Sequence, residues 1–241
     1  MIKFFRKIRK KLLEQNRVSK YLLYAIGEIV LVVIGILIAL QINNWNEIRK
    51  EKALEKELIN LLISDLEEKR EEHITDFTYA ENVIKRFQKL TDTWDNEGKL
   101  DTTNIKGNLR MLAMDIFFQN ENSPIYASLS SSNFWKQLPD TLTKQIDDVY
   151  RIQLKRVGIA FDKFTEYGTH CRLNFLTPND LMDLDRDTNI ILKNLEPVQK
   201  EFILKSKLYV NGGNRLISRL KSSADKIEDL IKKLQKYNQT K

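Results

Sequence analysis

An apolar run at residues 21–42 constrains this chain more than any other feature of its 241 residues. The run reads YLLYAIGEIVLVVIGILIALQI and contains a single charged residue, Glu28. As a helix, its 22 residues would extend about 33 Å, enough to cross the hydrocarbon core of a bilayer. The sequence therefore predicts one transmembrane helix over residues 21–42.

A cleaved signal peptide is the alternative interpretation of such a run. The apolar region of a signal peptide is shorter, about 7–15 residues, and a small-x-small cleavage site follows it. This run is longer and ends in Ala39-Leu40-Gln41-Ile42, without a site of that kind. We therefore expect an uncleaved anchor.

Positive charge is concentrated in the segment before the anchor. Residues 1–20 contain eight Lys and Arg residues and one Glu, whereas residues 43–241 carry 32 Lys and Arg against 31 Asp and Glu. The high pI of the chain thus comes from the N-terminal tail. We expect no nucleic-acid partner, because the sequence indicates no basic face on the folded domain. The positive-inside rule places the tail in the cytoplasm and the C-terminal part across the membrane.

The tail itself has apolar residues at helical spacing, which predicts an amphipathic helix on the inner leaflet. The alternative is a plain topology signal without defined structure. The cations expected at the membrane surface are Lys3, Arg6, Lys7, Arg9, Lys10 and Lys11.

One face of the anchor carries a polar group and two small residues. At about 100° per residue, Gly35 and Ala39 lie within roughly 20° of Glu28. Small residues let helix backbones approach, and a polar side chain can form a hydrogen bond across the contact. This pattern favours a helix–helix contact, in a homo-oligomer or with another membrane protein. The alternative is that Glu28 takes up a proton or extends toward the cytoplasmic surface, with Gly and Ala as ordinary residues of such helices.

The region after the anchor is predicted to be all-α. No Pro or Gly occurs between Gly35 and Gly98, and apolar residues recur at helical spacing, so the anchor is expected to continue as a long helix over residues 43–96. Residues 67–72, EEKREE, indicate a solvated stretch, with a hinge as the alternative. Residues 100–237 are expected to form an antiparallel helical bundle, so that 43–241 is one helical domain.

Shorter helices are predicted within this bundle. One covers residues 105–118, another follows Pro124, and a third covers 141–167. Thr177 and Pro178 have the residue types of an N-cap and first helical position. Pro197 is expected to open a helix to about residue 210, Asn211-Gly212-Gly213 to break it, and a final helix to cover residues 214–237.

Motifs for metal binding or catalysis are incomplete. Asp183, Asp185, Asp187 and Asn189 alternate as in a calcium loop, but the sixth and twelfth positions lack the required Gly and Glu. His170 and Cys171 are neighbours, and neighbours on a helix do not face each other. We expect no metal site, no cofactor and no catalytic residue.

The most aromatic and least regular stretch surrounds Tyr126, Phe134 and Trp135. These rings could line a pocket for a ligand or a partner. The alternative is that they form part of the core that a small helical domain needs.

Two segments resemble a known family. Residues 4–47, from FFRKIRKKLL through YAIGEIVLVVIGILIALQINNWNE, closely resemble the opening of a family of uncharacterised single-pass bacterial membrane proteins. Residues 125–150, IYASLSSSNFWKQLPDTLTKQIDDVY, are similar to that family's second recognisable segment, with Ser132-Asn133 where Ser-Gly is commoner. The resemblance implies a Gram-negative inner membrane and a periplasmic helical domain. It implies no activity, cofactor or catalytic residue.

From these observations the sequence favours a non-enzymatic, membrane-anchored helical interaction module. Its partner would bind the transmembrane helix, the periplasmic bundle, or both. The alternative function is a periplasmic small-molecule sensor with a pocket in the bundle.

Overall fold

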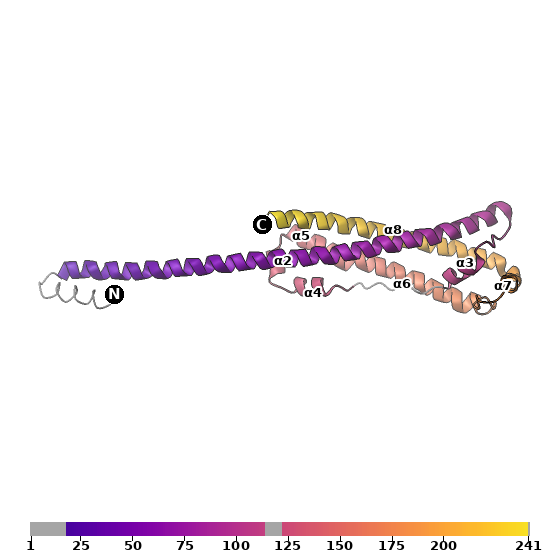
Figure 1. Ribbon diagram of the computed structural model, residues 1–241, viewed down its shortest axis with the longest axis horizontal. Helices are drawn as coiled ribbons and strands as arrows, with labels where there is room; N and C mark the ends of the chain where they lie inside the picture. Colours follow the sequence, from indigo (N-terminus) through magenta and orange to yellow (C-terminus); the bar gives the residue numbers. More distant parts are fainter. Residues whose placement is uncertain (1–17, 114–121, 241) are drawn as a thin grey trace. The chain divides into compact units, whose positions relative to one another are not determined.

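A computed structural model describes residues 18–113 and 122–240 and contains helices but no strand in those ranges (Figure 1). The expected all-helical class is therefore confirmed. Along the chain the helices are α2 (Val18–Glu97), α3 (Ile105–Leu112), α4 (Pro124–Ser130), η1 (Phe134–Gln137), α5 (Asp140–Asp147), η2 (Asp148–Gln153), α6 (Leu154–Cys171), η3 (Arg172–Leu176), α7 (Thr188–Leu195), η4 (Glu196–Val198) and α8 (Gln199–Gln239).

Helix α2 confirms that the apolar run continues into a long helix. It has 80 residues and no proline, and it ends where the sequence predicted. Gly98, directly after it, has a φ of +65°, and its N–H donates to the carbonyl of Trp94 at 2.9 Å. A left-handed glycine of this kind is a common way to end a helix.

The chain divides into two compact units, Met1–Lys56 and Glu57–Lys241. In the first unit the structure describes residues 18–56, all of them within α2. The predicted cytoplasmic tail at residues 1–17 lies outside the described residues.

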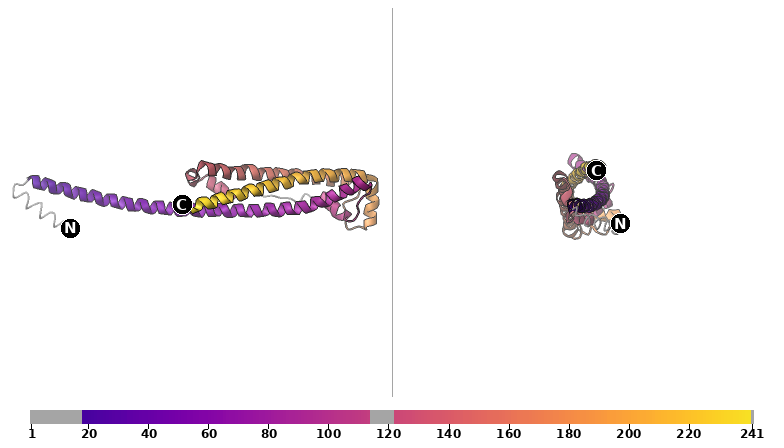
Figure 2. Two further views of the ribbon diagram at one scale, coloured as in Figure 1. Left: turned by 90° about the horizontal axis from the view of Figure 1, so that it is seen from above. Right: turned by 90° about the vertical axis from the view of Figure 1, so that its left-hand side faces the viewer.

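In the second unit, α8 lies along the part of α2 from residue 57 onward and along α6 (Figures 1 and 2). The α2–α8 contacts follow a regular order, because residue numbers rise along α2 as they fall along α8. The pairs are Asn60 with Asn238, Arg70 with Glu228, Glu81 with Lys221, and Asp95 with Lys207.

The helix predicted over residues 141–167 is present and longer than expected. Helices α5, η2, α6 and η3 follow one another without a loop from Asp140 to Leu176. Segments η2 and η3 are π-helical, which widens the backbone for about one turn in each. The helix predicted over 105–118 is described only as α3, because residues 114–121 lie outside the described ranges.

The predicted break at Asn211-Gly212-Gly213 is wrong, since α8 continues through it. A Cβ built on Gly213 would lie 2.1 Å from Cδ1 of Ile84 and 3.7 Å from Cε2 of Phe164. The missing side chain therefore lets α8 approach α2 closely. Packing against two helices outweighs the cost of glycine in a helix, about 1 kcal/mol per residue.

The helix predicted to start at Thr177 and Pro178 is also wrong. The Thr177 hydroxyl donates to the carbonyl of Arg172 at 2.8 Å and so closes η3. The chain then turns, and Asp180 takes a φ of +54°. The next helix, α7, begins at Thr188, where the Asp187 carboxylate accepts from the N–H of Asn189 at 2.7 Å. The predicted role of Pro197 is confirmed, because η4 contains it and leads into α8.

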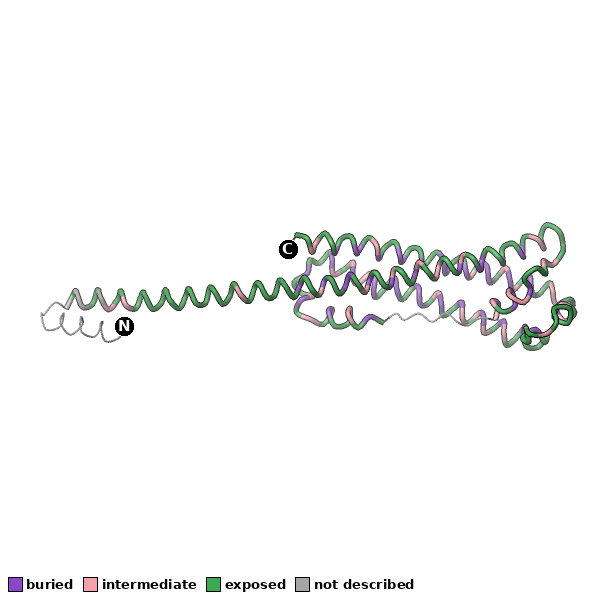
Figure 3. The backbone as a smooth tube through the Cα atoms, in the orientation of Figure 1, coloured by how far each residue is buried: buried purple, intermediate pink, exposed green. Residues whose placement is uncertain are grey.

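The buried residues of the second unit are purple in Figure 3. Their apolar side chains form two clusters. The first surrounds Phe87, Phe161 and Phe202, and the Tyr209 ring packs at a tilt against Phe87 with centroids 4.4 Å apart. The second is built by the start of this part of α2, the segment from α4 to η2, and the end of α8. Its fully buried members include Leu66.

Candidate functional site

The apolar segment of α2 is exposed along its length in the structure. Its leucine, isoleucine and valine side chains from Leu22 to Ile42 are all exposed. Within the described residues, one helix, near the N-terminus, is long and apolar enough to cross a membrane, judged on length and composition.

The predicted contact face lies on this segment. Because residues 18–97 are one α-helix, Glu28, Gly35 and Ala39 share a side of it. A Cβ added to Gly35 would meet nothing within 4 Å, and the same holds for Gly27, which points about 100° away from Glu28. The face thus has room for another helix backbone at Gly35.

Polar side chains follow the apolar segment. Asn43 donates to Glu47 at 3.0 Å, and Arg49 donates to Asn46 at 3.2 Å. The Arg49 guanidinium also lies over the Trp45 ring, 5.5 Å from its centroid. Trp is one of the residue types enriched at membrane–water interfaces. The basic tail residues Lys3, Arg6, Lys7, Arg9, Lys10 and Lys11 lie outside the described residues.

The predicted pocket residues lie in the second apolar cluster. Phe134 is a buried member, and Tyr126 and Trp135 pack against the cluster. The Tyr126 and Trp135 rings meet edge to face, with centroids 5.9 Å apart. The Tyr126 ring also stacks on Tyr150 at 4.5 Å and 5°. The three rings therefore pack against other side chains, as in the core alternative.

Two carboxylates anchor this group of rings. The Asp65 carboxylate accepts from the Ser123 hydroxyl at 2.9 Å and from the Tyr150 hydroxyl at 2.5 Å, and Tyr126 donates to Asp147. We call these five residues the Asp65 cluster. The sequence did not indicate a role for Asp65, Tyr150 or Asp147, because these residues meet only when three distant segments of the chain pack together.

Ser123 links the Asp65 cluster to the local structure of α4. Its hydroxyl oxygen accepts from the N–H of Tyr126 at 3.0 Å, and Pro124 occupies the first turn. An N-cap serine followed by proline is a strong local signal for a helix start. The same hydroxyl therefore starts α4 and fastens it to α2 through Asp65.

The two tyrosines of the cluster are hydrogen-bond donors at neutral pH. Burial, followed by the bond to Asp147, raises the pKa of Tyr126 to about 12. Burial, followed by the bond to Asp65, raises the pKa of Tyr150 further. Phenols with raised pKa values do not supply a nucleophile or a base near pH 7. Their hydrogen bonds, with that of Ser123, connect α2, the start of α4 and the α5–η2 segment.

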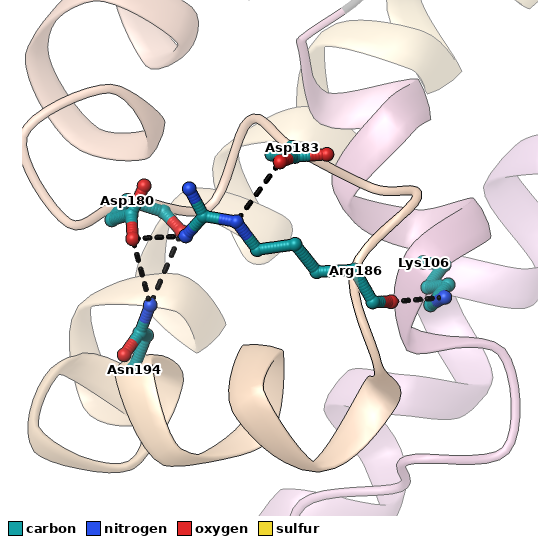
Figure 4. A network of polar contacts seen from close by, with 5 residues as sticks. All are labelled: Lys106, Asp180, Asp183, Arg186 and Asn194. Carbon is teal, nitrogen blue, oxygen red and sulfur yellow. Dashed lines mark hydrogen bonds and ion pairs between the residues drawn. The ribbon is translucent and has the colours of Figure 1, made fainter.

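The acidic stretch that resembled a calcium loop is held by an arginine (Figure 4). Arg186 bonds to the carboxylates of Asp180 and, at 2.9 Å, Asp183. Its carbonyl accepts from Lys106 at 2.6 Å, and the Asp180 carbonyl accepts from Asn194 at 3.3 Å. Across residues 18–113 and 122–240, no three or more His, Cys, Asp or Glu side chains are placed to hold a metal ion.

His170 and Cys171 point to different environments. His170 is exposed and lies near Asn174, 3.2 Å from its amide nitrogen, whereas Cys171 is fully buried in the first apolar cluster. Burial raises the pKa of the Cys171 thiol. These two side chains do not converge as a Cys–His nucleophilic pair must.

The structure also has a cavity that the sequence did not indicate. It has a volume of about 290 Å³ and lies between α2 and α8. Its lining residues are Arg70, Ile74, Phe77, Lys221, Ala224, Asp225 and Glu228. Arg70 pairs with Glu228 at 2.8 Å across it, and Lys221 lies 5.1 Å from the Phe77 centroid.

A comparison with known families decides the family membership. The model of a family of unknown function, DUF6090, matches residues 28–163. The chain belongs to this family. The DUF6090 match contains Glu28, Gly35 and Ala39 and all of the Asp65 cluster, and it ends within α6. No curated protein and no solved structure matches the chain.

Proposed function

We propose that this DUF6090 chain is a non-enzymatic, membrane-anchored helical interaction module. The observation that carries the proposal is the face of α2 that Glu28, Gly35 and Ala39 share, on which nothing lies within 4 Å of a Cβ added at Gly35. In a bilayer, helices associate through close backbone packing and hydrogen bonds between them, which this face offers.

The proposed setting is a bacterial inner membrane, with the N-terminus in the cytoplasm and the second unit in the periplasm. The charge asymmetry of the sequence supports this orientation, since eight cations precede the apolar run. The opposite residue order along α2 and α8 supports an antiparallel bundle for the periplasmic part. An alkaline-phosphatase fusion to the C-terminus should be active, and an inactive fusion would overturn the orientation.

The contact face has a direct test in native membranes. Two differently tagged copies are co-expressed and cross-linked, and other captured membrane proteins are identified by mass spectrometry. We expect Glu28→Leu combined with Gly35→Leu to weaken association with the partner, whether a second copy or another membrane protein.

The matched control is Gly27→Leu, which adds the same side chain to an equally open glycine off the face. It should leave association unchanged, and both variants should keep the thermal melt of the second unit. Equal cross-linking in the wild type and the double variant would disprove the contact face.

A periplasmic small-molecule sensor is the second candidate function, and the α2–α8 cavity favours it. Its volume of about 290 Å³ is at the lower limit of ligand pockets. A thermal-shift screen of the full chain in detergent tests this function. The variant Ala224→Leu fills the cavity. A ligand that stabilises the wild type but not this variant would support the sensor. A ligand that stabilises both equally would bind elsewhere.

A further inference from the structure

The core of the second unit is interrupted by a polar layer. On α2 the second apolar cluster ends at Leu66 and the first begins at Ala80. Between them, the buried side chains are Lys69 and His73. On α8 the corresponding gap lies between Leu220 and Ile227, where Ser223 and Ala224 are buried.

The two gaps lie at the same level of the helix pair. Arg70 pairs with Glu228 at one end of the gap, and Glu81 pairs with Lys221 at the other. We define the polar layer as Lys69, His73 and Ser223. The charged run at residues 67–72 is therefore only partly solvated, because Lys69 is 8% exposed.

Polar atoms in this layer lack partners. The His73 side chain is 1% exposed and its Nδ1 atom has no hydrogen-bond partner, and the same holds for Oγ of Ser223, also 1% exposed. No described carboxylate forms an ion pair with Lys69. Buried polar groups without partners keep the cost of losing their water, so this layer is less stable than the apolar clusters beside it.

The histidine in the layer is held neutral. Burial, followed by the nearby Lys69 ammonium, lowers the pKa of His73 to about 4. The other charged groups near this level do not compensate a proton on the ring. On α2, Asp76 has a raised pKa from burial and from Glu72. Other charged groups at this level form ion pairs, namely Arg70 with Glu228, Lys221 with Glu81, and Lys226 with Asp148. Asp225 lines the cavity.

A cavity lies at the same level of the helix pair as the polar layer. The α2–α8 cavity is lined by Arg70 and Ala224, the chain neighbours of Lys69 and Ser223. A proton on His73 would place a second cation in the core beside Lys69. Opening of the helices at this level would hydrate both groups.

We propose that the polar layer is a site of pH-dependent local opening. Protonation of His73 separates α2 from its neighbours at this layer, while the two apolar clusters stay packed. The direction follows from linkage, because the closed layer binds the proton less well than the open one. Opening is therefore suppressed above pH 6.5 and increases as the pH falls from about 6.5 toward about 4. With these two pKa values, the open population at pH 5 is about 30-fold larger than at pH 7.5.

Hydrogen–deuterium exchange on the full chain in detergent micelles tests this proposal. Exchange is compared at pH 7.5 and pH 5 after correction for the intrinsic rates. Peptides covering residues 67–79 and 221–228 should lose protection by about 30-fold at pH 5. Peptides covering residues 59–66 and 83–90, in the two apolar clusters, should keep it.

Two histidine variants separate the proposal from a general acid effect. His73→Gln, which does not titrate, should remove the pH dependence at the layer. His170→Gln replaces the exposed second histidine and should leave it intact. Any of three results would overturn the proposal. The wild type could show equal protection at both pH values, the pH dependence of protection could survive in His73→Gln, or all four peptide regions could lose protection equally at pH 5. If His73→Gln fails to fold, His73→Leu provides the same comparison with an apolar filling of the layer.

Discussion

Gly213 on α8 lies against Ile84 on α2 so closely that a Cβ at Gly213 would meet the isoleucine at 2.1 Å from Cδ1 and 2.6 Å from Cγ1. Ile84 is buried at 5% exposure, so its side chain has little room to move. Gly212, one residue earlier, would meet Phe164 at 3.5 Å, an ordinary contact. The two glycines therefore have opposite consequences for substitution.

Gly213→Ala should destabilise the second unit by about 1–2 kcal/mol, because forcing atoms into a packed interface costs more than alanine gains in helix propensity. Gly212→Ala should instead stabilise it by up to roughly 1 kcal/mol. Chemical denaturation of the full chain in detergent measures both. In an Ile84→Ala background, Gly213→Ala should lose its penalty, and a penalty that persists there would show that another contact causes it.

These glycines also show where sequence reasoning reached its limit. The long helix α2 was predictable because it lacks Pro and Gly from residue 36 to 97 and follows one periodicity. A Gly-Gly pair between two periodic segments indicates a break by the same local rules. Whether the pair instead permits a close approach depends on Ile84, more than a hundred residues away, so no local pattern could decide it.

The candidate sites divide in the same way. That Glu28, Gly35 and Ala39 share one helix face could be predicted from the sequence, since positions on a face follow from the helical repeat alone, while the contact itself stays a prediction. The Asp65 cluster could not, because its residues come from α2, the start of α4 and the α5–η2 segment. His73 has a helical position typical of core residues, but the lack of a hydrogen-bond partner at its Nδ1 follows from the packing of α2 against α8.

Replacement of the Asp65 carboxylate should loosen the attachment of α4. Asp65→Asn weakens two bonds to a charged acceptor, and we expect a loss of about 1–3 kcal/mol in the free energy of unfolding. Tyr150→Phe should cost less in the Asp65→Asn background than in the wild type, because both changes remove the same contact. Denaturation of the two single variants and the double variant measures this coupling. Asp162→Asn, at an exposed position of α6, is the control and should be neutral.

Stability should fall at alkaline pH through the Asp65 cluster. The pKa of Tyr126 is raised in the folded chain to about 12, above the ordinary value of 10. The folded state therefore holds this proton more tightly, and its contribution is complete below pH 10 and is lost as the pH rises toward 12. Thermal melts between pH 8 and 12 should decline less steeply for Tyr126→Phe than for the wild type. Tyr79→Phe, at an exposed tyrosine, is the control. If its melting temperature declined with pH as little as that of Tyr126→Phe, the decline would not come from Tyr126.

Cys171 should report on the integrity of the first apolar cluster. Its side chain is fully buried and burial raises the pKa of its thiol, so both access and thiolate formation are suppressed in the folded chain. We expect negligible maleimide labelling at pH 7 under native conditions and complete labelling in denaturant, measured by intact mass. The variant His170→Cys combined with Cys171→Ser moves the thiol to an exposed neighbouring position and should label rapidly without denaturant. Rapid labelling of wild-type Cys171 in the native chain would mean that the packing around α6 and α8 opens far more readily than its apolar contacts imply.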